Sequence, residues 1–153
     1  MKIWVDADAC PGPVRDILLR ASQRLKVPTV FVANRALSLP RSELVSTVQV
    51  GAGLDVADQH IAASAQKGDL AVTQDIPLAA LLVPRGVVVL DPRGELFTEE
   101  NISERLSVRN FMQELRESGV QTGGPSGFNA QDRQQFASAL DRELTRLLRK
   151  PPV

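Results

Sequence analysis

Aspartates follow three short apolar segments of this chain, and that arrangement is typical of a site for a divalent metal. Asp6 and Asp8 close the segment IWVDAD, Asp55 and Asp58 follow VQVGAGL, and Asp75 follows LAVTQ. Carboxylates about 4 Å apart repel each other by roughly 4 kcal/mol at an effective dielectric near 20, and a bound cation removes that cost. Because no cluster of His or Cys accompanies them, these oxygens favour Mg²⁺ or Mn²⁺ over Zn²⁺. Such an ion activates a water and stabilises the leaving oxygen of a phosphodiester.

Parallel strands would bring these aspartates together, and the sequence alternates strand and helix signals up to residue 90. Short runs rich in apolar or β-branched residues predict strands at residues 2–6, 29–32, 45–50, 70–73 and 87–90. Helix signals follow at Pro11 to Pro13, over the alanine-rich residues 54–66, and at Pro77. This alternation predicts a mainly parallel sheet of about five strands with helices on both faces. Two further helices are expected towards the C-terminus, with Thr98 and Asn129 as their caps.

The order of these elements sorts the aspartates, because ligands of open parallel sheets bind beyond the carboxyl ends of the strands. Asp6 ends the first strand, Asp8 opens the next turn, and Asp75 lies just beyond the fourth strand. We therefore expect them at one edge of the sheet. Asp55 and Asp58 are three residues apart, so both lie on one face near the start of the predicted helix and can point at the same edge.

Simpler explanations apply to each acidic or reactive residue taken singly. An Asp after a strand is usually a cap or part of a turn, although paired acids beside two apolar strand ends favour a functional cluster. Asp69 precedes the fourth strand and is expected at the opposite edge, where it caps or aids solubility. We interpret Cys10 as a packed structural thiol. His60 is about 200° around the helix from Asp58, so it is expected to face solvent or pack.

Composition limits the remaining function classes. The chain has 153 residues, consistent with a single domain over 1–153, and it carries 18 basic and 18 acidic residues. An RNA partner must therefore bind through a local patch or a metal. The longest apolar run, PLAALLV, is too short to span a bilayer, and the start MKIWVDADAC lacks a signal-peptide segment. A cytoplasmic bacterial enzyme or binding module is expected.

The chain resembles a known family at these same residues. VDADACPGPVRDI, GLDVADQHI, GDLAVTQDIPLA and GPSGF followed by AQDRQQF are similar to blocks of the YaiI/YqxD family of uncharacterised bacterial proteins. That family is similar to the PIN-like superfamily, whose active members are metal-dependent nucleases on a three-layer α/β/α sandwich. The resemblance implies that fold here, followed by C-terminal helices. It also implies a nuclease site in which Asp6 and Asp75 are catalytic, Asp55 or Asp58 is the acid on the middle helix, and Thr73 is the hydroxyl.

Further residues are candidates for contact with substrate. The Gly-rich loop with Gly124 and Ser126, together with Arg133, offers backbone amides and a guanidinium to a phosphate, although it lacks the Lys of a P-loop. Asn34 follows the second strand and can reach the same edge as the acids, while a turn is the simpler interpretation. With Thr73, these residues form the predicted substrate contacts.

Three functions remain open. The leading one is a Mg²⁺- or Mn²⁺-dependent nuclease that hydrolyses phosphodiester bonds, with RNA as its substrate. The second is a non-catalytic module of the same fold that binds RNA, a nucleotide or a protein through the same cleft. The third is a phosphatase of the haloacid-dehalogenase type, because Asp6 and Asp8 resemble its nucleophile and general acid. That family places further acids after the fourth strand, whereas Asp69 precedes it here.

Overall fold

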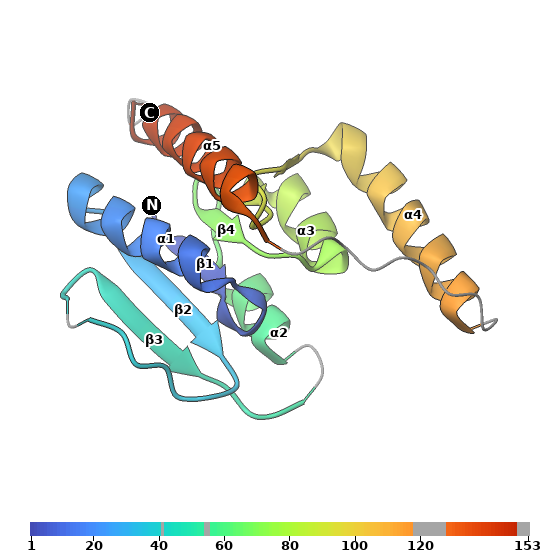
Figure 1. Cartoon of the computed structure of the whole chain (residues 1–153), viewed down its shortest axis with the longest axis horizontal. Helices are drawn as coiled ribbons and strands as arrows, with labels where there is room; N and C mark the ends of the chain where they lie inside the picture. The colour runs from blue at the N-terminus through green and yellow to red at the C-terminus, as the bar shows by residue number, and fades with distance from the viewer. Residues whose placement is uncertain (41, 54–55, 118–127, 150–153) are drawn as a thin grey trace.

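The computed structural model describes residues 1–40, 42–53, 56–117 and 128–149. Its centre is a six-stranded sheet in the order β3-β2-β1-β4-β5-β6 (Figure 1). The strands are β1 (Ile3–Asp6), β2 (Thr29–Ala33), β3 (Val45–Gln49), β4 (Leu70–Val72), β5 (Val88–Leu90) and β6 (Leu96–Phe97). The first five pair in parallel, as the sequence predicts. The short strand β6 pairs antiparallel with β5 and is not predicted from the sequence.

Helices cover both faces of the sheet. One face carries α1 (Gly12–Leu25) and α5 (Ala130–Arg149), which lie side by side in Figure 1. The other carries α2 (Val56–Ser64), α3 (Ile76–Leu82) and the beginning of α4 (Glu99–Glu117). Short 3₁₀ turns, η1 (Ala7–Ala9) and η2 (Val83–Arg85), follow β1 and α3. The predicted three-layer α/β/α sandwich is therefore confirmed.

Alternation along β1 decides which layer each of its side chains enters. Ile3 and Val5 pack into the core formed with α1 and α5, whereas Trp4 belongs to the core formed with α2 and α3. Side chains two residues apart in a strand share a face, so Asp6 points to the same side as Trp4. The strand thus delivers one carboxylate, at its carboxyl end, towards α2 and α3.

The strand order identifies the expected ligand crevice. From β1 the chain moves outward to β2 and β3, then returns to place β4 on the other side of β1. Ligands of open α/β sheets bind where the order reverses, beyond the carboxyl ends of the two central strands. Here that point lies between β1 and β4. Asp6 ends β1, and Thr73 follows β4 directly.

The predicted caps of the two C-terminal helices are both present. The Asn101 N–H donates to Thr98 Oγ1 at 3.1 Å, at the start of α4. The Asp132 N–H donates to Asn129 Oδ1 at 2.9 Å, and the Asp132 carboxylate accepts from the Asn129 N–H at 3.1 Å. These reciprocal bonds satisfy backbone donors that a helix start leaves free. Across the described ranges, none of the helices is long and apolar enough to cross a membrane.

Asp69 lies at the amino ends of the strands, opposite Asp6, where the sequence places it. It is buried, with 7% of its surface exposed. Its carboxylate accepts from Trp4 Nε1 at 3.0 Å, from the Lys2 N–H at 3.0 Å and from the Gln66 N–H at 2.9 Å. Solubility is therefore the wrong explanation for this residue. Asp69 is a structural carboxylate that satisfies a buried indole and two backbone donors.

Candidate active site

Asp6 and Thr73 join the ends of the two central strands. Asp6 is 9% exposed. The Thr73 hydroxyl donates to Asp6 Oδ2 at 3.0 Å, and Thr73 Oγ1 accepts the Asp75 N–H, also at 3.0 Å. Because Thr73 is itself buried, these bonds fix the orientation of the Asp6 carboxylate. The backbone beyond β4 therefore positions the acid at the end of β1.

Asp75 is the N-cap of α3. Its Oδ1 accepts the Leu78 N–H at 2.8 Å, and Pro77 occupies the first turn, where a missing N–H costs nothing. One carboxylate oxygen of Asp75 is thus committed to the helix start. The Asp75 charge nevertheless lies near enough to raise the pKa of Asp6.

Asp8 and Asp58 share a hollow with Asp6. The hollow has a volume of about 260 Å³ and is lined by Asp6, Asp8, Ala9, Asn34, Gly53, Val56, Ala57 and Asp58. We call it the acidic hollow. Asp58 comes from the first turn of α2 and makes a side-chain hydrogen bond with Asp6. Asp8 Oδ2 accepts the Asn34 N–H at 2.9 Å, so the backbone of Asn34, at the end of β2, holds the turn in place.

The pKa of Asp6 is raised above its ordinary value of 3.8. Burial is the largest cause, since it removes water from the charged form. The Thr73 hydrogen bond opposes this, the charges of Asp75 and Asp8 raise the pKa further, and the bond with Asp58 lowers it. Asp6 therefore ionises less readily than an exposed aspartate does.

Several predicted residues lie outside this cluster. Arg133 is exposed on α5 and does not line the acidic hollow. Asp55, Gly124 and Ser126 fall outside the described residues. Among the predicted contacts, Asn34 lines the acidic hollow, and its backbone N–H bonds to Asp8.

The two remaining candidates, Cys10 and His60, behave as the sequence indicates. Cys10 is half-buried against the α1 core, and burial raises the pKa of its thiol to about 12, so it is no thiolate nucleophile. The His60 ring packs near Trp4, with the ring centroids 6.2 Å apart.

A second hollow adjoins the first and was not anticipated from the sequence. It has a volume of about 250 Å³ and is lined by Asp58, Gln59, Ala62, Asp75, Pro77, Leu78 and Leu81. We call it the α2/α3 slot, since its walls come from these two helices and from Asp75 at the start of α3. Asp58 lines both hollows, so the acidic hollow and the slot meet at this carboxylate.

Comparison with known proteins decides the family. The sequence model of the uncharacterised YaiI/YqxD family matches residues 4–146. The chain belongs to this family. It is 83% identical to a UPF0178 protein of Myxococcus xanthus over 99% of both chains. It is 57% identical to UPF0178 proteins of Syntrophobacter fumaroxidans, covering 95% of each chain, and of Geobacter metallireducens, covering 98% of this chain and 97% of the relative. No solved structure matches it.

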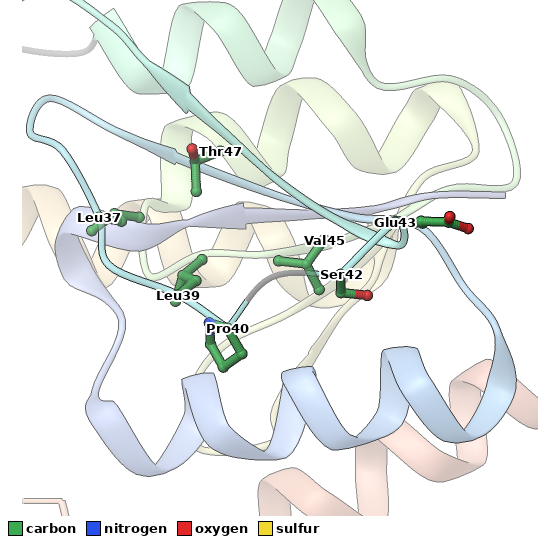
Figure 2. Close-up of a pocket in the computed structure, with 7 residues that line it drawn as sticks. All are labelled: Leu37, Leu39, Pro40, Ser42, Glu43, Val45 and Thr47. Carbon is green, nitrogen blue, oxygen red and sulfur yellow. The ribbon is translucent and has the colours of Figure 1, made fainter.

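Larger hollows of this YaiI/YqxD protein lie away from the acids of the candidate site. Figure 2 shows one of about 570 Å³, lined by seven side chains from β3 and the segment before it. A neighbouring hollow of about 960 Å³ shares Pro40, Ser42, Glu43 and Val45 and adds Arg20, Arg24 and Lys26 from the end of α1. Neither contains a predicted site residue. We place the candidate site at the smaller acidic hollow, because chemistry needs ionisable groups in mutual contact, and volume alone does not provide them.

Proposed function

We propose that this YaiI/YqxD protein is a Mg²⁺- or Mn²⁺-dependent phosphodiesterase that acts on RNA. The observation that carries the proposal is the placement of Asp6. This acid is buried at the reversal of strand order, bonded to Thr73 and Asp58, and close enough to Asp8 and Asp75 for their charges to raise its pKa. Ionising Asp6 there is unfavourable in the absence of a cation, so a divalent ion would stabilise the ionised cluster.

The carboxylates at this site fit a Mg²⁺ or Mn²⁺ ion whose remaining ligands are waters and substrate oxygens. Within the part of the chain that the structure describes, no three His, Cys, Asp or Glu side chains form a ready group for a metal ion. Mg²⁺, however, is commonly held by one or two carboxylates, with waters and substrate phosphates filling the other positions. Asp6 and Asp58 would be those ligands, with Asp8 and Asp75 adding negative charge. When bound, the ion supplies a Lewis acid and lowers the pKa of a coordinated water.

The residues around Asp6 have distinct roles in this proposal. Thr73 holds the Asp6 carboxylate in one orientation, and the Asp75 N–H holds the Thr73 hydroxyl. A carboxylate binds a cation in its ionised form, so metal binding would favour the ionisation of Asp6. The Asn34 N–H keeps Asp8 at the wall of the hollow.

Cleavage of defined RNAs tests the proposal. Purified protein is incubated with Mn²⁺ or Mg²⁺ and a panel of single-stranded and structured RNAs. Asp6→Asn and Asp75→Asn, made singly and together as a double variant, are expected to lower the cleavage rate by about 100-fold or more. The loss of a catalytic acid or base has an effect of this size. Asp141→Asn is the matched control, because Asp141 lies on α5, is exposed and pairs with Arg24 of α1. Intact RNA under all metal conditions, or full activity in the double variant, would remove the nuclease proposal.

Hydrogen bonding within the cluster favours one other candidate, a non-catalytic module that binds RNA. Thr73 and Asp58 bond to Asp6, while backbone N–H groups bond to Asp8 and Asp75, so protein donors already satisfy much of the cluster. Such a module would bind RNA in EDTA and cleave it at no metal concentration. A phosphatase of the haloacid-dehalogenase type is less well supported, because Asp69 lies at the opposite edge of the sheet, bonded to Trp4.

A further inference from the structure

The α2/α3 slot is an apolar recess directly beside the acidic hollow. Ala62 comes from α2, and Pro77, Leu78 and Leu81 come from α3. Asp58 and Asp75 also line the slot, and Asp58 lines the acidic hollow as well. A ligand that occupies both recesses would need a charged group joined to a less polar one.

Leu81 is an exposed apolar side chain in the wall of the slot. Its neighbours Leu78 and Leu82 are 2% and 0% exposed, whereas Leu81 is 60% exposed. An apolar side chain in water gains free energy when another apolar surface covers it, at about 25 cal/mol per Å². Such a wall next to a charged site is typical of a ligand pocket, where apolar walls bind and a few polar groups orient.

Gln59 supplies the orienting polar group. It is exposed and lines the slot on α2 together with the two carboxylates. Its amide has both a donor and an acceptor, and the carboxylates accept bonds from amino groups. The polar rim therefore favours a flat occupant with a hydrogen-bonding edge over an aliphatic chain, which has no such groups.

We propose that the α2/α3 slot binds the base of a nucleotide whose phosphate lies in the acidic hollow. This inference rests on the proposed function, since the bound ion is what draws a phosphate to an acidic surface. A nucleotide has the required form, a charged phosphate next to a flat base with a polar edge. A base that enters the slot must be unstacked and unpaired, so the substrate is single-stranded at that nucleotide.

Binding of AMP and ribose 5-phosphate, measured by calorimetry in the presence of Mn²⁺, tests the slot without any cleavage assay. The parent is expected to bind AMP at least about tenfold more tightly than ribose 5-phosphate, because only AMP covers the apolar walls. Ala62→Phe fills the slot and should abolish the preference. Ala63→Phe makes the same change on the exposed side of α2 and should retain it. Leu81→Asn, at an exposed position, should weaken the preference even where Ala62→Phe fails to fold.

The slot inference is overturned by equal affinity for the two probes, by no binding of AMP, or by an unchanged preference in Ala62→Phe and Leu81→Asn. Its failure can be separated from failure of the nuclease proposal. A preference for AMP that Ala62→Phe abolishes, in a protein that cleaves no RNA, supports the slot and removes the nuclease. RNA cleavage with Mn²⁺ in the absence of any preference for AMP supports the nuclease and removes the slot.

Discussion

At the scale of single residues, Asp6 determines what the site can do. The Asp6 carboxylate ends a strand and accepts a bond from a buried threonine, and three other aspartates influence its pKa. Its surroundings disfavour charge in the free protein, and a divalent ion would reverse that preference. The same placement that makes Asp6 unfavourable for stability makes it suitable for binding a cation. Functional sites commonly show this conflict between stability and activity.

Asp6→Asn is therefore expected to stabilise the protein at pH 7 while it removes activity. Asn keeps an oxygen for the Thr73 hydroxyl and carries no charge. The pKa of Asp6 is higher in the folded protein than the ordinary value of 3.8. Ionisation of Asp6 therefore lowers the stability of the parent as pH rises from about 3.8 to the folded-state pKa. Above that pKa, Asp6 causes no further loss of stability. Urea unfolding of parent and variant across this range should show the free-energy difference growing with pH and then levelling.

Asp141→Asn serves as the reference for that experiment, since Asp141 pairs with Arg24 at the surface, with 63% of its side chain exposed. Loss of this exposed pair should change the free energy of unfolding by at most about 1 kcal/mol. A curve for Asp6→Asn that runs parallel to that of the parent would show that the folded protein does not shift the pKa of Asp6 upward.

At the scale of elements, the site is built from helix and strand ends. Asp75 is at once the cap of α3 and a neighbour of Asp6. Asp58 is in the first turn of α2, so a shift of either helix start would open the cluster. The same two helices frame the α2/α3 slot. The site and its adjoining recess thus depend on where these helices begin.

Two substitutions of Asp75 separate its structural role from its chemical one. Asp75→Ala removes the cap of α3 and should lower the free energy of unfolding by about 1 kcal/mol, as loss of an Asp cap typically does. Asp75→Asn retains an acceptor for the Leu78 N–H and should change stability little. Both should lose RNA cleavage. Denaturant unfolding measures the first effect, and full activity in a well-folded Asp75→Asn would make Asp75 a cap only.

Sequence pattern predicted most of the elements because they obey local rules. Five strands are short runs rich in apolar or β-branched residues, and Thr98 and Asn129 are caps that bond within their own first turn. β6 has two residues, Leu96 and Phe97, and its pairing depends on the preceding turn and on β5. A segment of two residues is too short to show an alternating pattern, so the sequence does not predict this strand.

The site was predictable only where chain order fixes the location. Asp6 and Thr73 follow adjacent parallel strands, so topology alone brings them together. The environment of Asp69 depends on Trp4, which is 65 residues away in the chain, and its buried role could not be inferred from spacing. The α2/α3 slot has the same origin, since the packing of two helices, rather than a motif, exposes Leu81.

At the scale of the whole molecule, basic and acidic residues balance in number, while the candidate site itself is acidic. The chain has 18 basic and 18 acidic residues, and the acids of the site gather at the carboxyl edge of the sheet. Arg20, Arg24 and Lys26 line a hollow at the other end of α1, where Arg24 pairs with Asp141 at 3.2 Å. A polyanion that approaches the acidic edge is repelled until a divalent ion intervenes.

RNA association should therefore depend on divalent ions far more than on monovalent salt. We expect weak binding in EDTA and at least about tenfold tighter binding with Mn²⁺, measured with a cleavage-resistant single strand. Each RNA phosphate neutralised by a cationic side chain contributes about −0.7 to the slope of the logarithm of the binding constant against the logarithm of the salt concentration. Because the acidic edge offers few cationic side chains, we expect a slope shallower than about −2. Asp58→Asn should lose the increase in RNA affinity with Mn²⁺, because it removes a proposed ligand.

Strong binding in EDTA with a steep salt slope would instead place the RNA on a basic surface, such as the one around Arg20 and Lys26. The acidic edge would then not be the RNA site.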